Sequence, residues 1–213
     1  TGESLVMELY AKQFDWTARY AGKDNILGKR YFRLINDTNP MGLDPTDLNG
    51  NDDIVVRNEF HIPKGKQVDF KLASRDVIHS AYMPHFRAQM NCVPGMTTSF
   101  HYVPTITTEE MRRNPRVIQN MKEVNEILAE KGETAEFNYI LLCNKICGNS
   151  HYNMQMNIIV EEPEQFEAWL SKQKTVSDTP AAETPAKEGH AAVVPAGNEE
   201  AEKENKNIIA AIK

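Results

Sequence analysis

The sequence predicts an all-β domain, a β-sandwich, which carries an inserted helical segment and ends in a polar tail. Short stretches of alternating apolar and polar residues follow one another along most of the chain, and turn residues separate them. A longer stretch with a helical period interrupts this pattern once. The last part of the chain has no aromatic residue and is rich in Ala, Glu, Lys, Asn and Pro, a composition that cannot sustain a core.

Eight stretches have the alternation that is typical of half-buried strands. In the clearest, Val68, Phe70 and Leu72 alternate with Asp69 and Lys71. The other seven are residues 5–11, 31–35, 54–60, 77–80, 98–103, 137–143 and 155–160. Many short strands separated by turns are typical of sandwiches and barrels.

Residues 107–132 have a helical period instead. Four apolar residues recur on one face of this segment: Val117, Met121, Val124 and Leu128. Asn114 is suited to cap the helix with Pro115 in its first turn, and Gly132 is suited to end it. We expect this insertion to pack on the sandwich or on a neighbouring subunit.

The predicted domain comprises residues 1–171. Near its end, residues 164–170 have the spacing of a short helix with Phe166 facing inward. We expect residues 172–213 to form a low-complexity, disordered tail.

Composition excludes some classes of partner. The formal net charge is −6 and no basic stripe stands out, which argues against nucleic acid. A mild acidic excess suits a basic protein surface. No run approaches the roughly 20 apolar residues needed to cross a bilayer, so the polypeptide as given is expected to be soluble. The three cysteines, an odd number, argue against a framework made only of disulfides.

A dense motif, Cys-x3-Cys-x3-His-x2-Met, is formed by Cys143, Cys147, His151 and Met154. Thiolate, imidazole and thioether are ligands that copper prefers, and the motif has none of the hard oxygen ligands that calcium or magnesium require. Two thiolates on one loop can each bridge a pair of metal ions, and such a pair needs a second imidazole from elsewhere. His79, at the expected end of a short apolar strand, is the candidate.

Other interpretations of the motif stay open. A zinc site of two Cys and two His fits the first spacing, but it leaves Met154 without a role. A disulfide between Cys143 and Cys147 leaves both His151 and Met154 without one, and a metal-free core is the third possibility. The joint presence of the four residue types favours copper. Cys92 lies outside the motif, and we expect it to be a small buried residue.

Several segments together resemble cytochrome c oxidase subunit II, in particular bacterial forms of the Bacteroidetes type. They are Asp-Val-Ile-His-Ser at residues 76–80, Val-Pro-Gly at 93–95, the Cys–His–Met motif at 143–154, and Gln-Phe-Asp-Trp at 13–16. The resemblance covers about residues 5–170. It implies a cupredoxin-like Greek-key β-sandwich on the outer, periplasmic face of the inner membrane.

The resemblance also implies a dinuclear copper centre, CuA, with six ligand residues. Cys143 and Cys147 bridge both copper ions. His79 and Met154 complete one ion. His151 and the backbone carbonyl of Lys145 complete the other. The family usually has Glu at the position of Lys145, where the side chain also helps to hold a magnesium ion. Lys145 cannot do so, and no magnesium ligand is predicted here.

The implied function is electron relay. Subunit II of this family takes an electron from cytochrome c, or from a c-type haem domain, and passes it to haem in subunit I, where oxygen is reduced. Family members often have Trp at the position of Phe14, where the electron arrives. Phe14 itself, Trp16 or Tyr82 is the candidate here. The two membrane helices that the family has before this domain are absent from the sequence as given.

Two alternatives come from other classes. The CuA domain of nitrous oxide reductase shares the copper motif, but that enzyme also needs a large His-rich catalytic domain. The other alternative is a non-redox role, either a metal-free subunit of a quinol oxidase or a zinc-stabilised binding module.

Overall fold

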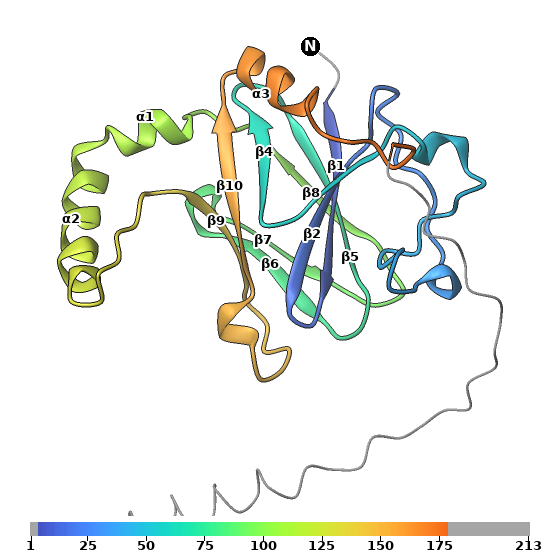
Figure 1. Cartoon of the computed structure of the whole chain (residues 1–213), viewed down its shortest axis with the longest axis horizontal. Helices are drawn as coiled ribbons and strands as arrows, with labels where there is room; N and C mark the ends of the chain where they lie inside the picture. The colour runs from blue at the N-terminus through green and yellow to red at the C-terminus, as the bar shows by residue number, and fades with distance from the viewer. Residues whose placement is uncertain (1–3, 179–213) are drawn as a thin grey trace, which may run out of the picture. The chain divides into compact units, whose positions relative to one another are not determined.

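The computed structural model describes residues 4–178. In this range ten strands form two mixed sheets of five strands each (Figure 1). Sheet one has the order β3-β2-β1-β5-β8, and sheet two has the order β4-β10-β9-β6-β7. The strands are β1 (Leu5–Lys12), β2 (Asp15–Tyr20), β3 (Ile54–Val56), β4 (Glu59–Pro63), β5 (Val68–Ser74), β6 (His79–Met83), β7 (Ala88–Cys92), β8 (Thr98–Tyr102), β9 (Tyr139–Cys143) and β10 (Gln155–Glu161).

Strand pairing places the core between the two sheets. β1 lies parallel to β5, with Met7 opposite Phe70 and Leu9 opposite Leu72, and all four side chains are fully buried. Burial of each such side chain contributes about 1.5–3 kcal/mol. β10 lies parallel to β4, and the chain crosses repeatedly between the sheets. The predicted all-β sandwich is confirmed.

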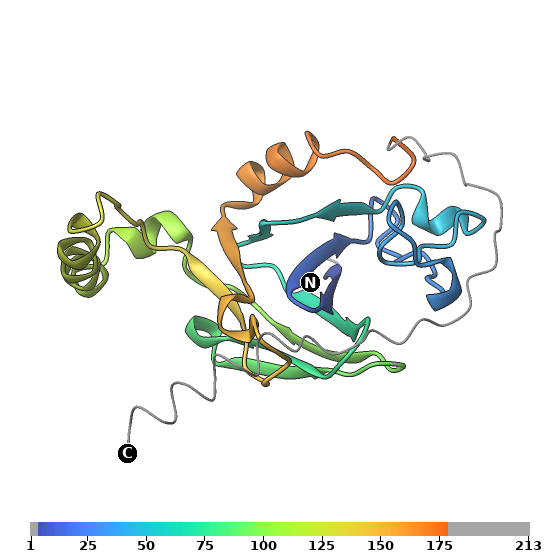
Figure 2. The ribbon, with the colours of Figure 1, turned by 60° about the horizontal axis from the view of Figure 1, so that its bottom comes forward.

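The helical insertion divides into two helices, α1 (Thr108–Arg112) and α2 (Pro115–Ala129). The Asn114 side chain accepts a hydrogen bond from the backbone N–H of Arg116, as expected of a helix cap. No residue of α2 is buried, and the helix lies outside the two sheets (Figures 1 and 2). The expected packing of the insertion on the sandwich is thus observed for α1, where buried Thr108 Oγ1 accepts the N–H of Val160 on β10 at 2.8 Å, and not for α2. Contact of α2 with a neighbouring subunit stays a prediction.

The structure corrects three of the expected strands. Residues 31–35 contain a short 3-10 helix, η1 (Phe32–Leu34), whose first side chain is 69% exposed. Residues 54–60 divide into β3 and β4, because Asn58 at φ +74° turns the chain from one sheet to the other. His79 begins β6, whereas it was expected to end a strand. His79 therefore lies at one end of the sandwich, where β6 begins, directly after the loop that joins β5 to β6.

The end of the described chain also contacts the sandwich. The third helix, α3 (Pro163–Leu170), confirms the predicted short helix, and its Phe166 is buried. Beyond it, Val176 N–H donates to the carbonyl of Asp53 at 2.8 Å. The predicted division at residue 171 stays a prediction, and residues 179–213 of the predicted tail lie outside the described residues. Among the helices described, none is long and apolar enough to span a membrane.

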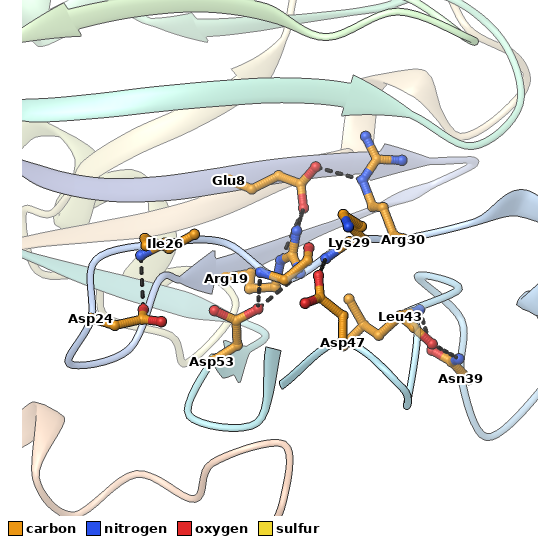
Figure 3. Close-up of polar contacts among 11 residues, drawn as sticks. Glu8, Arg19, Asp24, Ile26, Lys29, Arg30, Asn39, Leu43, Asp47 and Asp53 are labelled. Atoms are coloured by element: carbon orange, nitrogen blue, oxygen red, sulfur yellow. Dashed lines mark hydrogen bonds and ion pairs between the residues drawn. The ribbon is translucent and has the colours of Figure 1, made fainter. Parts of the chain in front are cut away.

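A buried ion network lies on the outer face of sheet one (Figure 3). Arg19 bonds Glu8 at 2.7 Å and Asp53 at 2.9 Å, and Arg30 bonds the other oxygen of Glu8 at 2.7 Å. The side chains of Glu8, Arg19 and Asp53 are at most 3% exposed. Burial raises the pKa of Asp53 to about 6, although Arg19 opposes this effect. The network fastens the long β2–β3 connection, residues 21–53, to β1 and β2.

Candidate metal centre

Five of the six predicted ligands lie in residues 143–154, which comprise the end of β9 and the loop that joins β9 to β10. Cys143 is the last residue of β9, and Met154 directly precedes β10. The loop is closed at its base, where the N–H of Cys143 donates to the carbonyl of Met154 at 3.0 Å. A 3-10 helix, η4 (His151–Asn153), returns the chain toward the sheet. The loop therefore leaves and re-enters adjacent strands, which holds its side chains against one end of the sandwich.

The donor atoms of the predicted ligands lie close together. The two thiol sulfurs, of Cys143 and Cys147, are 3.8 Å apart, and both cysteines are free and buried. His79 Nδ1 lies 3.7 Å from Cys143 Sγ, and His151 Nδ1 lies 3.6 Å from Cys147 Sγ. Met154 Sδ lies 3.9 Å from Cys147 Sγ. Metal–sulfur and metal–nitrogen bonds of about 2.0–2.3 Å place neighbouring ligand atoms at such separations.

The carbonyl oxygen of Lys145 also belongs to this cluster, because it lies 3.3 Å from Cys143 Sγ. The Lys145 side chain is exposed. Burial raises the pKa of the Cys147 thiol to about 11, and the neighbouring thiol of Cys143 adds to this effect. The Cys147 thiol consequently carries its proton when no cation is near, and a bound cation would displace this proton.

Asp76 orients the imidazole of His79. Its Oδ1 lies 2.9 Å from His79 Nε2. Partial burial alone would raise the pKa of Asp76, but hydrogen bonds from Gln13, His79 and Val77 outweigh burial and hold this pKa below its usual value. The ionised carboxylate accepts a hydrogen bond from Nε2–H and leaves the Nδ1 lone pair free on the side of Cys143. Such a carboxylate–imidazole pair is common behind metal-ligating histidines.

The tip of the β1–β2 hairpin covers the cysteine loop. The backbone N–H of Gln13 donates to Asp76 Oδ2 at 2.7 Å, and its side-chain amide donates to the carbonyl of Cys147. A Cβ atom at Gly148, which has φ +141°, would lie 2.7 Å from the Phe14 ring. Gln13 thus links the hairpin both to the loop that precedes His79 and to the loop that carries Cys147.

We expect Gly148→Ala to lower the free energy of unfolding by about 1–3 kcal/mol, because it combines an unfavourable backbone angle with overlap against Phe14. Gly65→Ala is the matched control, since Gly65 also has a positive φ but nothing lies within 4 Å of the added carbon. Urea unfolding of both variants measures the difference. Equal losses would show that the hairpin tip does not press on this loop.

The three aromatic candidates for electron uptake differ in exposure. Trp16 is 1% exposed, so it cannot itself contact a partner protein. Its ring lies edge-on to His79 at 6.3 Å, and its Nε1–H points to the carbonyl of Met154 at 3.4 Å. Phe14 is half-buried above Gly148, and Tyr82 is half-buried on β6. Phe14 is therefore the candidate that reaches both the surface and the cysteine loop.

Sequence reasoning assigned no role to Asp76 and Gln13. The spacing of Asp76 to His79 could have indicated a carboxylate–imidazole contact, but nothing in the sequence indicates the bonds of Gln13. Cys92 is fully buried, as predicted, and pairs with His79 across β6 and β7. Burial raises the pKa of its thiol to about 12.

Fold and cluster define a class: a β-sandwich protein whose buried thiols and imidazole could hold a soft metal ion. Over the shared residues, the chain is a homologue of cytochrome c oxidase subunit 2. "Alternative cytochrome c oxidase subunit 2" of Bradyrhizobium diazoefficiens is 37% identical over 174 residues, which are 81% of this chain and 52% of that protein. Cytochrome c oxidase subunit 2 of Thermostichus vulcanus is 29% identical over 126 residues, 59% of this chain and 29% of that protein.

The chain thus spans about half the length, or less, of these relatives. Among solved structures, the periplasmic domain of subunit II of cytochrome oxidase from Bradyrhizobium japonicum aligns with a TM-score of 0.49 and 19% identity. The alignment covers 80% of this chain and 94% of that one. No protein-family model matches the chain.

Proposed function

We propose that this chain is the copper-binding domain of an oxidase subunit II and relays electrons through a dinuclear CuA centre. The observation that carries the proposal is an unbroken row of four donor atoms: His79 Nδ1, Cys143 Sγ, Cys147 Sγ and His151 Nδ1. Consecutive atoms in the row are 3.7, 3.8 and 3.6 Å apart. The two sulfurs occupy the middle of the row and the two imidazoles its ends.

This order supports two metal ions. The donor atoms of His79, Cys143 and Cys147 all lie within 4.8 Å of one another, and His151 falls outside that group. A single tetrahedral ion would need all four donors around one point. Two ions that share both sulfurs would instead take one imidazole each.

The donor types support copper over zinc. Met154 Sδ is 1% exposed and close to Cys147, and thioether sulfur is a ligand for copper but not a usual one for zinc. We assign His79 and Met154 to one ion, and His151 and the Lys145 carbonyl to the other. When bound, copper supplies reversible one-electron chemistry.

The residues of the chain hold the donors and keep water away. His79 is fully buried, and Cys143, Cys147 and Met154 are at most 8% exposed. Asp76 fixes one imidazole, and Gln13 fixes the cysteine loop. Donors held in this way need little rearrangement when the charge of the site changes, which favours fast electron transfer.

Partners and location follow from the proposed family role. Cytochrome c or a c-type haem domain gives the electron, with Phe14 as the surface aromatic beside the cysteine loop, and haem in subunit I receives it. We place the domain on the periplasmic face of an inner-membrane complex, attached through N-terminal helices outside this chain. The exposed Lys145 side chain offers no carboxylate for magnesium at the border with subunit I.

Metal analysis after anaerobic reconstitution tests the proposal. The protein is offered equal amounts of copper and zinc, desalted and analysed for both metals. We expect two copper ions per chain and little zinc. A protein that retains one zinc ion and no copper would instead be the zinc-stabilised binding module.

Asp76→Asn should weaken copper binding by about 10–100-fold. The substitution removes the negative charge that orients His79, and it replaces a carboxylate oxygen that accepts a hydrogen bond from the backbone N–H of Gln13. Competition with a copper chelator measures the change. Asp37→Asn, which alters an exposed carboxylate in the β2–β3 connection, is the control. Unchanged affinity in Asp76→Asn would show that the orientation of His79 does not depend on this contact.

A further inference from the structure

A pocket of about 660 Å³ lies between the β2–β3 connection and the outer face of sheet one. None of the proposed copper ligands lines it. Strand residues Glu8, Tyr10, Arg19 and Lys71 form its floor, and residues 27–32 and Ile35 of the connection form one wall. This volume is in the range that holds small organic ligands.

The pocket is positively charged although the chain as a whole is acidic. Five basic side chains line it, Arg19, Lys29, Arg30, Lys71 and Arg75, against a single acidic one, Glu8. The formal net charge of the chain is −6. A local cationic site on an acidic protein attracts anions over a short range and is not explained by solubility.

Three of these cations are available to a ligand. Arg19 and Arg30 are engaged by Glu8 in the buried network (Figure 3). Lys29, Lys71 and Arg75 form no ion pair with any residue in the range 4–178. The charges of Arg19 and Arg30 are thus already neutralised, and the positive charge that remains free is that of Lys29, Lys71 and Arg75.

The remaining walls are apolar and held in place. Phe32 and Met96 are 69% and 56% exposed, and Ile35 and Met41 also line the pocket. Two hydrogen bonds between the Asn39 side chain and the backbone of Leu43, at 2.8 and 2.9 Å, stabilise the connection behind them (Figure 3). Exposed apolar side chains in a fixed pocket offer a surface for an apolar or aromatic group.

We propose that this pocket binds a small organic anion, in which an acidic group is carried on an apolar or aromatic body. Lys71 and Arg75 contact the acidic group, and Phe32 and Met96 contact the body. The site is distinct from the proposed copper centre, so binding does not depend on the metal.

Calorimetric titration with phenyl phosphate tests this proposal, with phenol and inorganic phosphate as the two halves of the probe. We expect saturable binding of phenyl phosphate and at least about tenfold weaker binding of either half. The double variant Lys71→Gln, Arg75→Gln should lose at least about tenfold in affinity for phenyl phosphate, because charge-assisted hydrogen bonds are lost. Lys66→Gln, a change before β5 that does not line the pocket, should lose nothing.

Four results would overturn the proposal. Phenol that binds as tightly as phenyl phosphate would show a merely apolar patch. Inorganic phosphate that binds equally well would show that the apolar walls take no part. Full affinity in the double variant would place the anion site elsewhere. No binding of phenyl phosphate to the folded protein would show that the pocket does not hold such an anion. Circular dichroism melting confirms that each variant is folded.

Discussion

Cys147→Ser is expected to lower copper affinity by more than about a hundredfold and to abolish the binding of two ions per chain. Loss of a residue that only orients a ligand already costs about 10–100-fold, so loss of a shared thiolate must cost more. Cys147 Sγ lies within 3.9 Å of Cys143 Sγ, His151 Nδ1 and Met154 Sδ, so it has three other proposed donors around it, as many as Cys143 Sγ has. Serine leaves a hard oxygen that copper binds poorly in this setting.

Metal analysis and chelator competition measure this effect, and Cys92→Ala is the matched control. Cys92 is equally buried and faces His79 across β6 and β7, but it is not one of the proposed ligands. The control should therefore keep both copper ions. Two copper ions in Cys147→Ser, bound as tightly as in the parent protein, would rule out a shared sulfur at this position.

Arg19→Met is expected to lower the free energy of unfolding by about 3–5 kcal/mol, the largest stability loss we anticipate. The guanidinium bonds two buried carboxylates, Glu8 and Asp53, and also the carbonyl of Gly28 at 2.9 Å. Methionine fills a similar volume but leaves Asp53 without its cation. Domains of this size are stable by only about 5–15 kcal/mol, so the variant loses a large part of the total.

The loss should depend on pH. The pKa of Asp53 is about 6 in the folded protein against 3.8 for the free side chain, so the folded state holds more protons between these values. Stability from this group is therefore present at low pH and falls as pH rises through that window. Without Arg19 the pKa of Asp53 in the folded protein rises further. The loss in the free energy of unfolding of Arg19→Met is therefore expected to be smaller at pH 5 than at pH 7, as measured by urea unfolding.

Arg30→Met is the control for this second prediction. Arg30 is 24% exposed and bonds only one of the carboxylates, Glu8, which keeps its bond to Arg19. A loss of at most about 1 kcal/mol is expected, as for other partly exposed ion pairs. Equal losses in the two variants would show that burial of the Arg19 charge does not dominate.

Patterns with short-range causes were predicted well from the sequence. The alternation of Val68, Phe70 and Leu72 is a direct consequence of burying one face of β5, and Asn114 with Pro115 starts α2 as its cap chemistry requires. The residue types of the Cys–His–Met motif likewise predicted which side chains gather at one end of the sandwich. These features depend on neighbours in sequence or on ligand chemistry.

Features set by distant contacts were not predicted. Residues 31–35 alternate like a strand, but within residues 4–178 they join no strand of either sheet, and Phe32–Leu34 form η1 instead. β2 was not predicted although it pairs with both β1 and β3, because its half-polar sequence is stabilised by Arg19 bonding Glu8 and Asp53. The position of Gln13 over the cysteine loop depends on a contact with Cys147, 134 residues further along the chain.

The electron paramagnetic resonance spectrum of the copper-loaded, oxidised protein tests the dinuclear site most directly. If Cys143 and Cys147 clamp a pair of ions between His79 and His151, the hyperfine pattern will be that of one unpaired electron shared equally by two copper nuclei. A spectrum with the splitting of a single copper nucleus, at full metal loading, would contradict the paired site and with it the proposed electron relay.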